Sequence, residues 1–128
     1  MKSLYFILFF ITFGSRYFFF GICQNIPSPR REQTSTLVGT RLYFFGGNTI
    51  IGGGSNEVWY LDLSSSFSIS KPPWHSDAAM PVGYNFGTSC LSPIDNSTVF
   101  LIGGRTWITN TKSYSYTSSV YKFDSKTS

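Results

Sequence analysis

Few side chains in this chain have the types and the spacing that metal or nucleophilic chemistry requires. His75 is the single histidine, and a histidine without Cys, Asp or Glu at ligand spacing makes a poor metal site. The two cysteines are Cys23 and Cys90, and nothing in the sequence ties Cys90 to His75 as a nucleophile and its base. We therefore predict no catalytic residue, no bound metal and no cofactor.

Two other patterns with chemical potential also have simpler interpretations. The run GGGS at 52–55 lacks the Gly-Lys-Ser/Thr ending of a phosphate-binding loop and does not open a helix, so we interpret it as a flexible turn. The four aspartates, which form no recognisable acid pair, are Asp62, Asp77, Asp95 and Asp124. Asp62 and Asp124 recur at matching places in a repeat described below, so hydrogen bonding in a turn explains them better than catalysis.

The elements that position these residues are predicted to be strands. Of the 128 residues, 41% are hydrophobic and 19% aromatic, which is ample for a core, while only 12% are charged. Gly, Ser and Thr are abundant, and long segments rich in Glu, Lys and Ala are absent. This composition favours strands and turns over helices, and the length allows at most one domain of ordinary size.

The first 23 residues, MKSLYFILFFITFGSRYFFFGIC, resemble a secretory signal peptide. Lys2 gives a positive start, 4–14 an apolar stretch, and Gly21 and Cys23 are small residues at the −3 and −1 positions of a cut before Gln24. An uncleaved membrane anchor is the alternative, although Arg16 interrupts the apolar run before it reaches spanning length. Both alternatives place the rest of the chain outside the cell or on the outer side of a membrane.

The remaining chain carries little net charge and has two features of exported proteins. Without 1–23 it keeps eight Lys and Arg against six Asp and Glu, a net charge of +2, and these charges form no basic stripe of the kind that binds nucleic acid. Asn96-Ser97-Thr98 is an acceptor sequence for N-glycosylation. Cys90 then stands alone; we interpret it as a small buried strand residue, the alternative being a disulfide to a cysteine outside this chain.

A repeated pattern organises the chain. RLYFFGG at 41–47 and VFLIGG at 99–104 are apolar runs that end in Gly-Gly pairs 57 residues apart. Each is followed by Val, an aromatic residue, one intervening residue, an apolar residue and Asp, at 58–62 and 120–124. Strand-like runs also precede both, TSTLVGT and GTSCLSP, and the loop after the second Gly-Gly pair is five residues longer. A repeat of this length indicates an array of four-stranded antiparallel units, with a fourth strand near 72–76.

The unit resembles a kelch repeat of the kelch/galactose oxidase-like β-propeller superfamily, over roughly 34–128. The matching residues of the first copy are Gly46, Gly47, Asn56, Val58, Trp59, Asp62 and Trp74, and those of the second are Gly103, Gly104, Val120, Tyr121 and Asp124. The glycines let the backbone bend where strands crowd, the apolar strands should be covered on both faces, and Trp59, Trp74 and Tyr121 should fill the space between units.

The resemblance implies an all-β chain that forms part of a propeller. We expect a signal segment at 1–23, a polar linker at 24–33, a first blade at 34–80 and an incomplete second blade at 81–128. Since propellers have about four to eight blades, two blades suggest a fragment of a longer protein. Most relatives in this superfamily are binding scaffolds, so we expect an exported module that binds a protein or carbohydrate through its loops. The alternative is part of a copper-radical oxidase whose active site lies in other blades.

Overall fold

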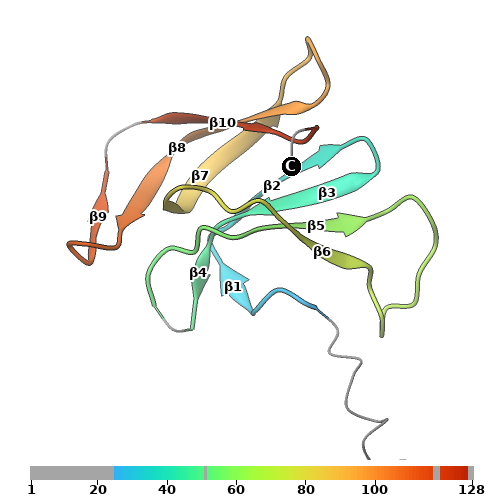
Figure 1. Ribbon diagram of the computed structural model, residues 1–128, viewed down its shortest axis with the longest axis horizontal. Helices are drawn as coiled ribbons and strands as arrows, with labels where there is room; N and C mark the ends of the chain where they lie inside the picture. The colour runs from blue at the N-terminus through green and yellow to red at the C-terminus, as the bar shows by residue number, and fades with distance from the viewer. Residues whose placement is uncertain (1–24, 51, 117–118, 127–128) are drawn as a thin grey trace, which may run out of the picture.

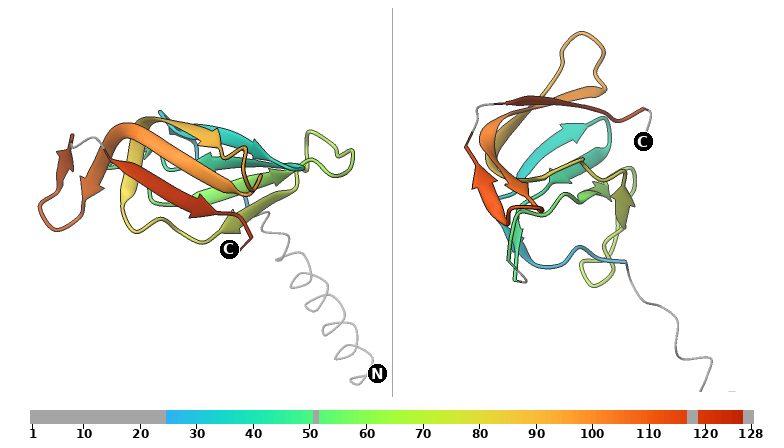
Figure 2. Two further views of the ribbon diagram at one scale, coloured as in Figure 1. Left: turned by 90° about the horizontal axis from the view of Figure 1, so that it is seen from above. Right: turned by 60° about the vertical axis from the view of Figure 1, so that its left-hand side comes forward.

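The computed structural model describes residues 25–50, 52–116 and 119–126, and every regular element in these ranges is a β-strand. The sequence-based prediction of an all-β chain with antiparallel sheets is therefore confirmed. The predicted signal segment, 1–23, lies outside the described residues. Figures 1 and 2 show the strands gathered into two layers.

The first sheet is an antiparallel meander in which four strands lie side by side in the order of the sequence. Its strands are β2 (Thr34–Val38), β3 (Arg41–Phe45), β5 (Val58–Asp62) and β6 (Trp74–Asp77). Val, Leu, Tyr, Phe and Trp dominate β3 and β5, as expected for strands in the middle of a sheet. The fourth strand begins at Trp74, within the segment where the sequence predicted it.

The second sheet repeats the first three strands of this arrangement, with the order β10-β8-β7, and has a short strand β9 paired to the end of β8. Its strands are β7 (Gly83–Leu91), β8 (Thr98–Ile108), β9 (Ser113–Ser115) and β10 (Val120–Asp124). The sequence analysis interpreted 105–118 as a loop. In the structure β8 continues to Ile108, and β9 pairs with the end of β8. Alternating β-branched and aromatic residues in RTWI favour this strand extension.

A short ribbon of two strands, β1 (Arg30–Arg31) and β4 (Asn48–Thr49), continues the first sheet beyond the glycines. Arg31 pairs with Asn48, and Asn85 of β7 pairs with Arg105 of β8 at the matching place in the second sheet. β1 therefore corresponds to the start of β7, although the sequence placed it in a polar linker.

The pairing of strands is the same in the two sheets. Phe45 pairs with Val58 directly before Gly46, and Ile102 pairs with Val120 directly before Gly103. At the other end of these strands, Arg41 pairs with Asp62 and Thr98 with Asp124. The sequence repeat thus corresponds to a repeat in three dimensions, residue by residue, with the Gly-Gly pairs and the aspartates in equivalent positions.

Each sheet has two faces because successive side chains of a strand point to opposite sides. In the first sheet, Tyr43, Phe45 and Val58 share what we call the Tyr43 face, and the opposite side is the Phe44 face, formed by Leu37, Leu42, Phe44, Trp59, Leu61 and Trp74. In the second sheet, Val99, Leu101, Tyr121 and Phe123 form the Leu101 face, and Phe100, Ile102 and Val120 form the Phe100 face.

The core lies between the Tyr43 face of the first sheet and the Leu101 face of the second. Tyr43, Phe45, Val58, Val99 and Leu101 are each at most 1% exposed and belong to one hydrophobic cluster. The Phe123 ring lies 5.5 Å from the ring of Tyr43 and 5.2 Å from that of Phe45. Where β2 of the first sheet lies beside β7 of the second, the Thr34 and Ser89 hydroxyls lie 2.8 Å apart and link the two strands.

The packing differs from the expectation that both faces of the apolar strands are covered. The core lies between the faces that are turned toward each other. On the outward faces, Trp59 is still buried at 7% exposed, but Ile102 is 42% exposed. Tyr121 packs between the sheets as expected, whereas Trp59 and Trp74 lie on the Phe44 face and contribute nothing to this interface.

Candidate binding site at the glycine end of the sheets

The Gly-Gly pairs lie at one end of the molecule, from which the longest connections leave the sheets. The left-handed backbone angles there suit glycine, with φ of 62° and 93° at Gly46 and Gly47 and of 69° and 74° at Gly103 and Gly104. Beyond them stand the β1–β4 ribbon and the hairpin of β8 and β9. The loop at 52–54 passes close to the side chain of Trp107, so the connections of the two sheets are in contact.

A partly buried polar network joins the two sheets at this end. Asn85 is 0% exposed, and its side-chain amide donates to the side-chain oxygen of Asn48 at 2.6 Å. The Asn85 oxygen accepts a hydrogen bond from Nε of Arg105 at 2.9 Å. The Tyr114 hydroxyl donates to the same Asn48 oxygen at 3.0 Å, and the Asn48 amide donates to Glu32. These bonds fix side chains from β4, β7, β8 and β9 relative to one another.

The guanidinium of Arg105 is held at the centre of this end by charge and by aromatic rings. Its Nη2 lies 3.8 Å from a carboxylate oxygen of Glu32. Its central carbon lies 3.9 Å from the ring centroid of Tyr114 and 4.5 Å from that of Phe86, distances typical of cation–π contacts. Phe86 is 57% exposed and has a left-handed backbone with φ of 59°. An oriented cation is thus presented beside an accessible aromatic face.

Further aromatic and polar groups surround this centre. The rings of Trp107 and Tyr114 lie 4.8 Å apart, and Tyr116 is 73% exposed. Beside them an open hollow of about 510 Å³ is lined by residues of β1 and β4 and of their connections, namely Pro29, Arg30, Arg31, Asn48, Thr49, Ile50 and Gly52. Such a surface offers rings for stacking and amide, guanidinium and carboxylate groups for hydrogen bonds.

A second ion pair anchors the β1 end of this surface. Nη2 of Arg30 lies 2.5 Å from a Glu57 carboxylate oxygen, and Nη1 of Arg30 donates to the Gly46 carbonyl at 3.1 Å. The hydrogen bond from Arg30 holds the pKa of Glu57 below its usual value. The Trp59 indole donates to the same carboxylate at 3.3 Å. Trp59, which the repeat pattern singled out, thus helps to orient Glu57.

The repeated aspartates have matching local roles at the far end of the sheets. The Asp62 carboxylate accepts a hydrogen bond from the Ser64 N–H at 2.8 Å, and the Asp124 carboxylate accepts one from the Lys126 N–H at 3.0 Å. The backbone hydrogen bond from Ser64 lowers the pKa of Asp62. In both copies the carboxylate closes a turn two residues on, as the sequence interpretation anticipated.

The remaining residues singled out by the sequence lie apart from this site. Trp74 packs its ring 5.2 Å from Phe44, and Asn96 is exposed in the turn between β7 and β8 with φ of 52°. Cys90 is exposed, so its interpretation as a buried strand residue was wrong. It points to the Phe100 face of the second sheet, which no described segment covers.

The residues of the polar network were not predicted from the sequence. One signal was present: Asn48 and Arg105 each follow a Gly-Gly pair directly and so occupy equivalent positions of the repeat. Asn85 and Glu32 do not follow a Gly-Gly pair. They join the network because the two sheets lie side by side. A network of this kind depends on which units lie side by side, and the repeat pattern does not contain that information.

Neither metal ligands nor membrane helices are found in the part of the chain that the structure describes. There, no three side chains of His, Cys, Asp and Glu come close enough together to hold a metal ion. The same residues include no helix with the length and hydropathy needed to cross a membrane. Compared with the sequence profiles of known protein families, the chain matches none.

Proposed function

We propose that this chain forms two units of a kelch-type β-propeller that serves as an exported binding module. The observation that carries the proposal is the way in which the two equivalent sheets pack. Tyr43 and Phe100 are equivalent, and so are Phe44 and Leu101. The interface therefore joins the Tyr43 face of one unit to the counterpart of the Phe44 face in the next, a head-to-tail contact.

Head-to-tail contacts between equivalent units propagate into rings or open arrays. The Phe44 face of the first sheet and the Phe100 face of the second carry the same kinds of surface as the two faces that already pack together. Phe44, Leu61 and Trp74 on one and Phe100, Ile102 and Val120 on the other are apolar. Further units of the same kind would cover both faces, as the blades of a propeller cover one another.

The surroundings of the glycines support the same arrangement. A Cβ atom added to Gly46 would lie 2.1 Å from the carbonyl oxygen of Tyr84, which belongs to the neighbouring unit. A Cβ added to the equivalent Gly103 meets nothing within 4 Å. Position 103 is a glycine although no described segment packs there. A following unit, placed as the second sheet is placed against Gly46, would leave no room for a Cβ at this position.

The binding role rests on the site at the glycine end. Arg105, Phe86 and Tyr114 present a fixed cation and aromatic faces, and they are carried by β7, β8 and β9 where these strands extend past the Gly-Gly pairs. The ligand classes that fit are a protein surface with a carboxylate or a carbohydrate with an acidic group. The signal-like segment and the exposed Asn96 acceptor support an extracellular location.

The test is a binding screen with the chain secreted from a eukaryotic host, using an array of acidic and neutral oligosaccharides and an array of extracellular protein domains. We expect saturable binding that Arg105→Gln weakens by about tenfold or more, because a charge-assisted contact is lost. Lys71→Gln removes the same charge from the loop at the opposite end of the sheet and should leave binding unchanged. Phe86→Ser, at an exposed ring, gives a second variant if Arg105→Gln disturbs folding. No binding on either array, or equal loss in the Lys71 variant, overturns the proposal.

A further inference from the structure

The outer edge of β10 differs from the outer edge of its counterpart β5. In the first sheet β6 pairs along β5, with His75 opposite Tyr60 and Trp74 opposite Leu61. In the second sheet β10 is the equivalent of β5, and within the described residues its sheet ends there. Among the described residues, no strand occupies the place beside β10 that β6 occupies beside β5.

The backbone of β10 is oriented to accept a strand at this edge. The Ser119 carbonyl accepts from the Gly103 N–H at 3.2 Å, and the Ser125 N–H donates to the Ser97 carbonyl at 3.2 Å, so these odd-numbered positions face β8. Successive residues of an antiparallel strand turn their N–H and C=O groups to alternate sides. The groups of Val120 and Lys122 therefore point away from β8, as do those of the equivalent Val58 and Tyr60, which pair with β6.

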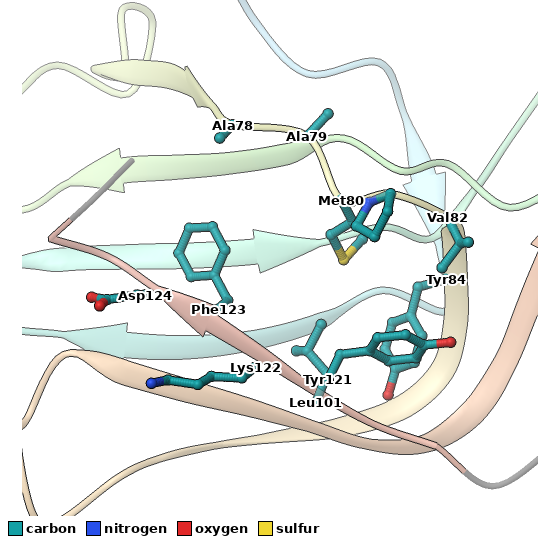
Figure 3. A pocket seen from close by; sticks show the side chains of 11 residues that line it. Ala78, Ala79, Met80, Val82, Tyr84, Leu101, Tyr121, Lys122, Phe123 and Asp124 are labelled. Carbon is teal, nitrogen blue, oxygen red and sulfur yellow. The ribbon is translucent and has the colours of Figure 1, made fainter.

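A pocket lies beside this edge at the place that corresponds to Trp74. It has a volume of about 270 Å³ and lies between β10 and the connection from β6 to β7 (Figure 3). Its apolar wall includes Leu101, Tyr121 and Phe123, together with Met80. In the first sheet Trp74 pairs with Leu61 and packs on Phe44, and the counterparts of Leu61 and Phe44 are Phe123 and Leu101. Both counterparts line the pocket.

We propose that the edge of β10 binds an extended polypeptide segment as an antiparallel fourth strand, with a tryptophan side chain seated in this pocket opposite Phe123. Main-chain hydrogen bonds to Val120 and Lys122 supply affinity, and the aromatic pocket supplies specificity, as in other cases of strand addition. The occupant is a segment with the chemistry of β6, whose sequence around Trp74 is KPPWHSD at 71–77.

The charge of Lys122 refines the expected ligand. Tyr60, its counterpart, lies opposite His75, the residue that follows Trp74. A segment with an acidic residue directly after the tryptophan would place opposite charges across the two strands, a favourable cross-strand pair. The ligand is therefore an extended segment in which tryptophan is followed by Asp or Glu. This inference rests on the equivalence of the two sheets and does not require a ligand at the glycine end.

The test uses the secreted chain and the synthetic peptide KPPWHSD, observed by amide chemical shifts and by calorimetry. We expect saturable binding, with the largest shifts at Val120 and Lys122. Replacing the peptide's tryptophan by alanine should weaken binding about tenfold or more, since a buried tryptophan dominates contacts of this size. Replacing its histidine by glutamate should strengthen binding about two- to fivefold.

Variants of Lys122 separate main-chain pairing from other contacts. Lys122→Pro removes the outward N–H without touching a bond to β8, and it should abolish binding, whereas Lys122→Ala keeps the backbone donor and should retain it. If the proline variant does not fold, a peptide N-methylated at the histidine removes the reciprocal bond, from the histidine N–H to the Lys122 carbonyl, and should not bind. Equal binding of the alanine and tryptophan peptides, shifts confined to other residues, or no binding at millimolar peptide overturns the proposal. A dimer in which a second copy protects the Val120 and Lys122 amides also overturns it.

Discussion

Replacing Gly46 by alanine should destabilise the chain far more than the same change at Gly103, although the two glycines are equivalent. Both have left-handed backbone, with φ of 62° and 69°, so alanine incurs a similar conformational cost of about 1 kcal/mol at each. At Gly103 nothing lies within 4 Å of the new methyl group, and this cost is the whole effect.

At Gly46 the new methyl group also collides with the neighbouring unit. Its Cβ would lie 2.1 Å from the Tyr84 carbonyl oxygen, and the same oxygen accepts a hydrogen bond from the Gly47 N–H at 2.8 Å. The backbones must separate, which costs about 1–3 kcal/mol for overpacking, and weakening that hydrogen bond costs about 1 kcal/mol more. We therefore expect a loss of about 3–5 kcal/mol for Gly46→Ala and of about 1 kcal/mol for Gly103→Ala.

Urea denaturation of the two variants and the parent chain, at a protein concentration where all three are monomeric, measures the difference. The comparison is matched, since both changes add one methyl group at equivalent positions with similar backbone angles. Equal losses of unfolding free energy would refute the head-to-tail packing of the two sheets. The severe contact of the added Cβ, at 2.1 Å, is with Tyr84 of the neighbouring unit, whereas its contact within the first unit, with the Ser55 carbonyl oxygen, is milder at 3.0 Å.

Three further predictions concern the core, the polar network and the turn at Asp95. Leu101→Ala should cost about 3 kcal/mol because the side chain is 1% exposed, whereas Val120→Ala, at 65% exposed, should stay within about 0.5 kcal/mol; similar losses in urea would contradict the assignment of the two faces. Asn85→Ala should cost about 1–3 kcal/mol, since it leaves polar groups of its neighbours unsatisfied, and an unchanged thermal midpoint would contradict this. Hydrogen bonds from the side chain and N–H of Thr98 hold the pKa of Asp95 well below its usual value, so its contribution to stability is present at neutral pH and is lost as the pH falls below about 4. Asp95→Asn should flatten the acid limb of the stability profile measured by urea titration, and an identical limb would argue against that role.

The repeat unit could be predicted from the sequence because the residues that define it act within their own strand or turn. The Gly-Gly pairs and Asp62 and Asp124 stand at the two ends of paired strands, and their spacing gave the correct equivalence between copies. The fourth strand near Trp74 followed from the same pattern. These features depend on turns and on strand propensity, which neighbouring residues determine.

Burial and the site could not be predicted in the same way, because both depend on which faces meet. Cys90 was expected to be buried, but its face of β7 has no described neighbour. The strand β9 was not predicted from the sequence because polar residues surround it. It also lies in the longer connection of the second copy, so the first copy has no equivalent strand to indicate it. Asn85 belongs to the candidate site through its hydrogen bond to Asn48 of the other unit, and such contacts leave no periodic trace in the sequence.

The connections after the two Gly-Gly pairs differ in length and structure, although equivalent strands carry them. The second connection is five residues longer and folds into a hairpin with β9, yet the pairing of β8 with β10 keeps the register of β3 with β5. The glycine end therefore tolerates changes in length without a shift in the strands that hold it. An engineer could exchange or lengthen these connections to change the surface at the glycine end while leaving the sheets intact, and selection would have the same freedom to diversify one surface on a constant framework.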